Sequence, residues 1–281
     1  MDWIKGIQAS LDYIEQHLTS ELSPDEIAKS VYISPFHFQR VFSLLSGMSV
    51  GEYIRARRMS LAGQALSLTD QKVIDVALRY GYESPESFCK AFTRFHGVSP
   101  SQAREPGVTL RMVAPLLFQI NLKGGIKMDY RIEKKDEITL LAAVYQVNTE
   151  SSFKECPKCF DAYIEKGLQQ YCAPAIAVCF PEHAKALSFR YAIGDEVAAD
   201  ANVPEGMEKF TLPARTWAAF PAKGALPKSI QDTWQRVYSE WLPTSGYKFA
   251  QDAPEMEIYS YGDTSSEDYV CELWLPLEKA E

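Results

Sequence analysis

Hydrophobic residues recur at intervals of three and four over roughly the first 105 positions, the spacing of amphipathic helices. Two predicted helices open with the same Ser-Pro formula: SPFHFQRVFSLLSG at residues 34–47 and SPESFCKAFTRFHG at residues 84–97. A serine N-cap accepts a hydrogen bond from a free backbone N–H, and a proline in the first turn already has the helical φ angle. We therefore predict two capped helices, ending at Gly47 and Gly97 in the left-handed conformation.

Each of these helices has an apolar stripe and an opposite stripe whose residues differ between the two copies. At 100° per residue, the apolar stripes are Phe38, Val41, Phe42 and Leu45 in the first helix and Phe88, Ala91, Phe92 and Phe95 in the second. The opposite stripes are Phe36, Gln39, Arg40 and Ser43 in the first and Glu86, Cys89, Lys90 and Thr93 in the second. We expect the apolar stripes to be buried and the opposite stripes to be exposed to different surroundings.

A shorter amphipathic helix precedes each capped helix, at residues 23–34 and 71–84, and a long helix over residues 50–68 connects the two pairs. A helix, a tight turn and a second capped helix form the helix-turn-helix unit, whose second helix enters the major groove of DNA. Two such units predict an all-α domain over residues 1–107 that places two recognition helices in successive grooves.

Beyond residue 128 the pattern changes to alternating strands, with more Pro, Gly, Tyr and Trp. Strand, strand, helix, strand, strand is predicted twice: 128–136, 139–147, 153–168, 173–180 and 189–197, then 208–214, 215–224, 227–243, 255–262 and 268–278. We predict a multidomain chain in which a linker (108–127, with Gly-Gly) joins the helical domain to an α+β domain (128–281) of two related halves. A cleft between such halves is a natural ligand site.

Charge is distributed unevenly along the 281 residues, whose net charge is −8. The first 107 residues are nearly neutral, with 11 Lys and Arg against 12 Asp and Glu, while the remainder has 18 against 25. The basic residues of the first part cluster, so a neutral total is compatible with a basic DNA-binding face. They are Arg40, Arg55, Arg57, Arg58, Arg79, Lys90, Arg94 and Arg104.

The sequence has no run of eighteen apolar residues and no signal-peptide pattern, so we expect a cytoplasmic protein without a membrane partner. The six cysteines lack a disulfide-scaffold spacing, and we expect reduced thiols. Cys156 and Cys159 form a lone Cys-x-x-Cys, which is a weak indication of a metal site without a second pair. No metal and no cofactor are predicted.

Residues 5–107 resemble the DNA-binding domain of the AraC/XylS family, and in particular the MarA, SoxS and Rob group. The motifs are YIRARRM in the connecting helix and GYESPESFCKAFTRFHGVSPSQAR at the second unit. The resemblance implies base contacts in two grooves from Phe36, Gln39, Arg40, Ser43, Glu86, Ser87, Cys89, Lys90 and Arg94. Arginine can bind guanine, glutamine adenine, and a glutamate can accept from cytosine.

Residues 128–281 resemble the GyrI-like effector-binding domain, through WQRVYSEWLPTSGY, PEMEIY and ELWLPLE. The resemblance implies an aromatic pocket for a lipophilic or cationic effector, with Glu257 as the carboxylate. Strand alternation alone favours the other placement, with Glu255, Glu257 and Tyr259 outward and Met256 in the core. The implied pocket residues are Glu257, Trp217, Phe220, Tyr238, Tyr247, Tyr259 and Trp274, whereas Ile230, Trp234, Val237 and Trp241 are expected to pack a core.

These features predict a ligand-responsive transcriptional regulator that is not an enzyme. Its expected partners are double-stranded DNA, a small-molecule effector and RNA polymerase. Two alternatives stay open for the second domain. Some GyrI-like domains hydrolyse small electrophiles, in which case Glu257 would act as a general base. The acidic half would otherwise bind another protein.

Overall fold

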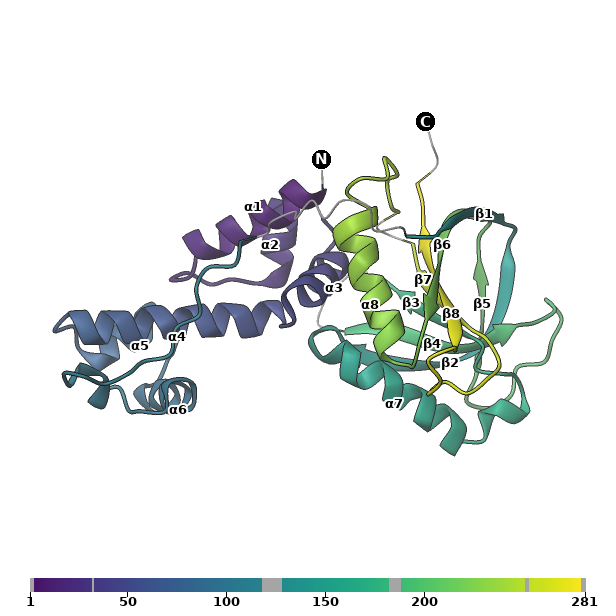
Figure 1. The fold of residues 1–281 in the computed structure, drawn as a ribbon. Coiled ribbons are helices and arrows are strands. Elements are labelled where there is room, and N and C mark those ends of the chain that lie inside the picture. The colour runs from purple at the N-terminus through teal and green to yellow at the C-terminus, as the bar shows by residue number, and fades with distance from the viewer. Residues whose placement is uncertain (1–2, 32, 118–127, 182–187, 251–252, 279–281) are drawn as a thin grey trace. The chain divides into compact units, whose positions relative to one another are not determined.

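The computed structural model describes residues 3–31, 33–117, 128–181, 188–250 and 253–278 (Figure 1). The chain divides into two compact units. Unit 1 is Met1–Pro35 with Ser46–Gln119, and unit 2 is Phe36–Leu45 with Ile120–Glu281. The first of the two Ser-Pro helices, α3 (Pro35–Ser46), therefore belongs almost entirely to unit 2, although the segments on either side of it belong to unit 1.

Unit 1 is helical, as predicted. Its α-helices among the described residues are α1 (Trp3–Gln16), α2 (Pro24–Ser30), α4 (Val50–Leu68), α5 (Val73–Arg79) and α6 (Pro85–His96). Phe88 and Phe92 of α6 are completely buried in one cluster with Met59 and Leu66 of α4. Gly97 ends α6 with φ of 82°, so the predicted left-handed cap is confirmed there.

Several arginines of unit 1 hold the fold together. Arg57 of α4 forms an ion pair with Glu15 of α1, with 2.8 Å between Nη2 and Oε2. Arg58 donates from Nε to the carbonyl oxygen of Leu18 at 2.9 Å, and Arg104 donates from Nη1 to that of Thr69 at 2.9 Å. These three side chains of the predicted basic cluster are thus engaged within unit 1.

The segment after α6 packs against α4. Val113 donates its backbone N–H to Ser60 Oγ at 2.9 Å, and Leu116 donates to the Tyr53 hydroxyl at 3.0 Å. This segment is the first part of the predicted linker, and its second part (118–127) lies outside the described residues. The described part of the linker is therefore bonded to the helix that it crosses.

Unit 2 contains an eight-stranded antiparallel sheet in the order β1-β6-β8-β7-β3-β4-β2-β5. The strands are β1 (Arg131–Lys135), β2 (Ile138–Asn148), β3 (Ile176–Phe180), β4 (Ser188–Glu196), β5 (Glu208–Leu212), β6 (Arg215–Lys223), β7 (Glu255–Tyr259) and β8 (Val270–Pro276). Every predicted strand of this region is present.

The two predicted halves exchange their first strands. β1 of the first half pairs with β6 of the second, and β5 of the second pairs with β2 of the first. The halves join at the centre of the sheet, where β3 pairs with β7 and Ala177 lies opposite Glu257. The strands β1 to β4 of the first half correspond in chain order to β5 to β8 of the second. With this correspondence the strand order is symmetric about the centre of the sheet, where the equivalent strands β3 and β7 meet.

Two helices lie against the same face of this sheet (Figure 1): α7 (Ser152–Glu165) and α8 (Lys228–Arg236), which continues into a π-helical turn (Val237–Trp241). Apolar residues of α3, α7 and strands β2 to β4 form a cluster on this face. The other face packs around Trp217, Trp274 and Met256.

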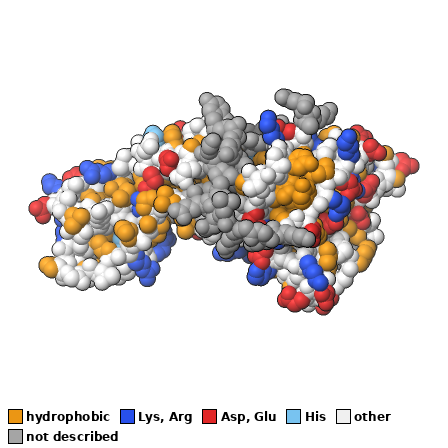
Figure 2. All heavy atoms as spheres, turned by 45° about the horizontal axis from the view of Figure 1, so that its top comes forward, with side chains coloured by type: hydrophobic (Ala, Val, Ile, Leu, Met, Phe, Trp, Pro, Cys, Tyr) orange, Lys and Arg blue, Asp and Glu red, His pale blue; other side chains and the backbone are white. Residues whose placement is uncertain are grey.

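Red acidic side chains gather along the right-hand and lower edges of the face of unit 2 that Figure 2 shows, in keeping with the acidic excess of this part of the sequence. Among the described residues, no helix is both long enough and apolar enough to cross a membrane.

Candidate functional site

The outer stripe of α6 is exposed, as predicted. Glu86, Ser87, Lys90 and Arg94 are exposed and Cys89 is half-buried. The helix is fixed by the hydroxyl of its N-cap Ser84, which accepts from the Ser87 N–H at 3.2 Å, and by its buried phenylalanines. This arrangement leaves the polar stripe free to meet a partner, and its contacts with bases stay a prediction.

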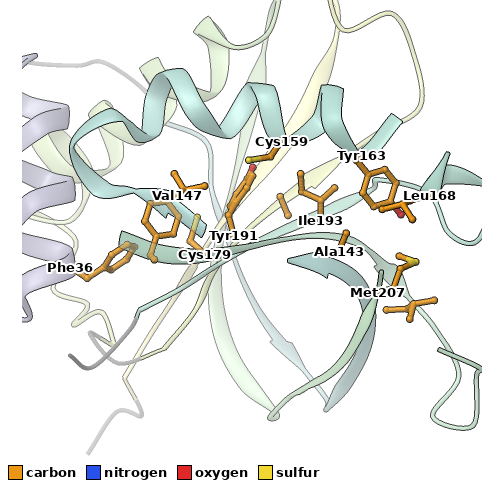
Figure 3. Packing of buried hydrophobic residues seen from close by; sticks show 13 residues of the cluster. Phe36, Ala143, Val147, Cys159, Tyr163, Leu168, Cys179, Tyr191, Ile193 and Met207 are labelled. Carbon is orange, nitrogen blue, oxygen red and sulfur yellow. The ribbon is translucent and has the colours of Figure 1, made fainter. Parts of the chain in front are cut away.

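The outer stripe of α3 is buried, and the expectation of exposure was wrong for it. Phe36 and Gln39 are 2% exposed, and Arg40 and Ser43 are 7% exposed. The physical reason is that unit 2 provides partners for this stripe. The Phe36 ring meets the edge of Phe189 at 5.2 Å between centroids, and Figure 3 shows Phe36 at the end of a row of apolar side chains through Cys179 and Tyr191. Base contacts from this stripe stay a prediction for another arrangement of the helix.

Unit 2 contains a cavity of about 530 Å³ between α7, α8 and the centre of the sheet. Its walls include Phe153 and Phe160 of α7, Ile230 and Trp234 of α8, and Tyr191 and Glu257 of the sheet. A largely apolar cavity of several hundred cubic ångströms with a few polar groups is typical of small-molecule sites. The cavity lies where equivalent elements of the two halves meet, as the strand pattern predicted.

Glu257 is the carboxylate at the base of this cavity, and three neutral donors hold it. Trp234 donates from Nε1 to Oε1 at 2.8 Å, and the hydroxyls of Tyr259 and Tyr191 donate to Oε2 at 2.7 and 3.1 Å. Glu257 is only 9% exposed. Burial, followed by the charge of Glu257, raises the pKa of both tyrosines well above the ordinary value, so they act as neutral donors. The carboxylate is oriented by these bonds, and no Lys, Arg or His side chain of the described residues forms an ion pair with it.

Glu255, two residues earlier on the same strand, is fully buried and carries a different set of partners. Its Oε2 lies 2.9 Å from Arg40 Nε. The two atoms form an ion pair, but the N–H bond is not aimed at the oxygen as a hydrogen bond requires. Its Oε1 accepts from the Tyr238 hydroxyl at 2.5 Å and lies 3.6 Å from His37 Nδ1. Burial raises the pKa of Glu255, and Arg40 and Tyr238 oppose that rise. Glu255 is therefore tied to α3, whereas Glu257 faces the cavity.

Arg40 connects the two carboxylates. Its guanidinium carbon lies 4.6 Å from the centre of the Trp234 ring, the same ring whose N–H is bonded to Glu257. Burial alone would lower the pKa of Arg40, but Glu255, then Cys179 and Glu257, raise it on balance. The guanidinium thus stays charged inside unit 2, where it also lines the cavity.

The other predicted pocket residues lie in several places. Tyr259 lines the cavity with Glu257. Trp217 and Trp274 pack on the opposite face of the sheet, Phe220 and Tyr247 pack around Trp241, and Tyr238 is bonded to Glu255. The structure therefore brings only Glu257 and Tyr259 of that set into the cavity wall.

Trp234 is the main cavity residue that the sequence analysis missed, because its helical spacing with Ile230 predicted core packing. Both residues are buried, and both also line the cavity. A buried tryptophan needs an acceptor for its indole N–H. The sequence does contain one indication of this role: the helix with Trp234 is followed by a strand that carries two glutamates, which can accept the indole N–H.

The two thiols of the Cys-x-x-Cys motif have different surroundings. Cys156 lines the cavity, whereas Cys159 is buried and donates to the Glu155 carbonyl oxygen. Burial raises the pKa of Cys156 well above its ordinary value and that of Cys159 to about 11. Within the described part of the chain, no three His, Cys, Asp or Glu side chains gather as a metal site.

Comparison with known proteins matches two families, one in each part of the sequence. Residues 131–277, more than half of the chain, match the family described as integron-associated effector binding protein, and residues 27–106 match a helix-turn-helix domain family. The chain belongs to the integron-associated effector binding protein family. It carries this effector-binding domain behind an AraC-type helix-turn-helix domain, so both resemblances noted in the sequence are confirmed.

Relatives of the helix-turn-helix part include the HTH-type transcriptional activator AarP of Providencia stuartii, which is 45% identical over 98 residues covering 35% of this chain and 73% of AarP. The right origin-binding protein of Escherichia coli (strain K12) is 38% identical over 104 residues, covering 37% of this chain and 36% of that protein. The chain thus spans about a third of the length of some curated relatives.

Among solved structures, SAV2435 bound to tetraphenylphosphonium is similar with a TM-score of 0.46 and 23% identity, over 54% of this chain and 95% of that one.

Proposed function

We propose that this chain is a ligand-responsive DNA-binding transcriptional regulator whose effector is a small lipophilic cation. The observation that carries the proposal is Glu257, a carboxylate that is almost fully buried in the wall of an aromatic cavity. Burying a negative charge without a cation is costly, so the cavity is expected to favour a ligand that brings one.

The aromatic walls support a cation that is also apolar. Phe160 and Tyr259 meet edge to face with 5.0 Å between centroids, next to the carboxylate. Such rings bury apolar groups and attract positive charge to their faces. A cation that carries aromatic groups around its charge both buries apolar surface and presents a positive charge to the rings. A small hydrated cation would lose its bound water and gain few new contacts.

The DNA-binding part of the proposal is supported by the exposed stripe of α6. Lys90 and Arg94 are exposed on a helix whose opposite face is fixed by Phe88 and Phe92. Cations on a rigid helix are suited to DNA phosphates and base edges. The finer hypothesis is that α6 and α3 read two successive major grooves. DNA as target implies the cytoplasm as location and RNA polymerase as a further partner.

Calorimetric titration of the full-length chain tests the effector site. The probes are tetraphenylphosphonium and the neutral triphenylphosphine oxide, which is similar in size and aromatic content. We expect the cation to bind wild type more tightly than the neutral probe does. We expect it to bind Glu257→Gln at least tenfold more weakly than wild type, because the variant loses the attraction of the carboxylate. A tenfold loss of affinity corresponds to about 1.4 kcal/mol of binding free energy.

Glu196→Gln is the matched control, since Glu196 is an exposed glutamate at the end of β4. Equal cation affinity in wild type and Glu257→Gln would exclude Glu257 as the cation partner. Chemical turnover of a bound small electrophile that disappears in Glu257→Gln while binding persists would favour the hydrolase alternative.

A further inference from the structure

The geometry points to Arg40 as an internal ligand of unit 2: it places its own cation against Glu255 and Trp234, keeps the recognition helix α3 docked, and is displaced when a cationic effector binds. This inference rests on the proposed function and adds its regulation. It joins three observations: the buried outer stripe of α3, the Arg40–Glu255 ion pair and the shared Trp234 ring.

The docking of α3 is built like a specific interface. Phe36 packs against Phe189, and the His37 ring meets the edge of Phe249 at 4.3 Å between centroids. Arg40 then adds a buried ion pair. An aromatic anchor beside a desolvated arginine is the composition of an interface hot spot. Phe36 and Arg40 belong to the stripe predicted to read DNA, and Gln39 and Ser43 of that stripe are buried as well, so a docked α3 has no reading face.

Arg40 reproduces the chemistry of the proposed effector. A lipophilic cation needs an aromatic face and a nearby carboxylate. The guanidinium has the Trp234 ring at 4.6 Å and the Glu255 carboxylate at 2.9 Å. The same Trp234 side chain donates its indole N–H to Glu257, so the ring contacts both the guanidinium and the second carboxylate. The chain thus fills one of its two carboxylate positions with its own cation.

The Trp234 ring makes the two occupants compete. Tyr238 stacks on this ring with 5.7 Å between centroids and an interplanar angle of 14°, while Arg40 lies over it at 4.6 Å. A bulky aromatic cation bound against Glu257 would need the ring that Arg40 uses, and its charge would repel the guanidinium. The effector therefore favours the form with α3 released, which is the difference in affinity that a ligand needs to shift an equilibrium.

Hydrogen exchange of the full-length chain, read by mass spectrometry, tests the displacement. Tetraphenylphosphonium is added to saturation, as verified by calorimetry. We expect the amides of α3 to lose protection while those of α6 stay unchanged as the internal reference. Unchanged protection of α3 at saturation would overturn the inference.

The ion pair itself is tested without ligand. In Glu255→Gln the α3 amides should exchange faster than in wild type, while α7, α8 and the strands keep their protection. Glu196→Gln should behave as wild type. Equal protection of α3 in Glu255→Gln and wild type would contradict a holding role for the ion pair.

A third measurement tests the inference even if the Glu255→Gln variant does not fold. Arg40→Gln removes the internal cation, so tetraphenylphosphonium should bind about tenfold tighter than to wild type, a coupling of ordinary size for linked sites. Unchanged affinity would contradict competition. If the cation binds neither wild type nor Arg40→Gln, the proposed function fails along with the displacement. In that case faster exchange in Glu255→Gln would still establish the docking.

Discussion

Helices α3 and α6 both begin with a proline that follows a serine, bury the same phenylalanine positions and differ in whether their opposite stripe is covered. Position by position, Phe36 corresponds to Glu86 and Arg40 to Lys90. The α3 residues are buried in unit 2, whereas the α6 residues are exposed. The contrast shows that the Ser-Pro start and the inner stripe determine where a helix forms, while residues far away in the sequence, such as Phe189 and Glu255, determine whether its outer stripe is free.

The chemistry of the two outer stripes matches their surroundings. α3 presents an aromatic ring and a planar guanidinium, which suit an apolar surface with a carboxylate and a tryptophan. α6 presents a carboxylate and a flexible ammonium, which are costly to bury. The difference between the helices in sequence is therefore also a difference in how well each tolerates burial.

The largest expected effect concerns the two cations. Arg40→Ala leaves Glu255 buried without its cation and should lower the free energy of unfolding of unit 2 by about 3–5 kcal/mol near neutral pH. Lys90→Ala should change it by less than about 0.5 kcal/mol because Lys90 is exposed. Urea unfolding followed by tryptophan fluorescence measures this, since Trp217, Trp234 and Trp274 lie in unit 2.

The Arg40→Ala effect should also depend on pH. The pKa of Glu255 is already raised by burial and rises further without Arg40. A raised carboxyl pKa means that the folded state retains a proton that the unfolded state releases, so stability is fully present below the ordinary carboxyl pKa and is lost as pH rises through the folded pKa. The gap between wild type and variant should be small in acid and widen toward neutral pH. A gap independent of pH would mean that Arg40 contributes through packing instead.

A smaller effect is expected from the aromatic anchor. Phe36→Ala should lower the free energy of unfolding of unit 2 by about 3 kcal/mol, because it leaves a cavity beside Phe189. Glu86→Ala, the corresponding change in α6, should stay within about 0.5 kcal/mol. The same fluorescence experiment compares them. Similar small losses for both would mean that the outer stripe of α3 is not packed against the sheet of unit 2 in most molecules.

The fold was predictable because its signals are local. Ser-Pro caps, three-and-four spacing and alternation predicted helices α2 to α8 and all eight strands within a few residues, and the repeated strand pattern placed the cavity between the halves. The exchange of first strands was not predictable, because the pairing of β1 with β6 depends on contacts across some eighty residues.

The site was predictable only in part for the same reason. Glu257 and Tyr259 follow from a strand motif. Alternation alone would have placed Glu255 in solvent, and its burial depends on Arg40 from a helix more than two hundred residues earlier. Trp217 and Trp274 are predicted pocket residues on the correct strands, but strand alternation puts them on the other face of the sheet.

The smallest expected effect uses the exposed helix alone. If Lys90 contacts a phosphate, Lys90→Ala should reduce the steepness of the plot of log affinity against log salt by about 0.9, which is about fivefold in affinity at 0.15 M salt. Fluorescence anisotropy with a random-sequence duplex is the appropriate measurement, because phosphate contacts do not depend on the operator. Lys154→Ala, an exposed lysine of α7, is the control with the same loss of charge. An equal reduction in both variants would reflect net charge alone, and no reduction in Lys90→Ala would remove this part of α6 from the DNA-binding surface. A reduction confined to Lys90→Ala would place this part of α6 against the DNA phosphates, which is the contact that the exposed stripe of α6 allows and the buried stripe of α3 does not.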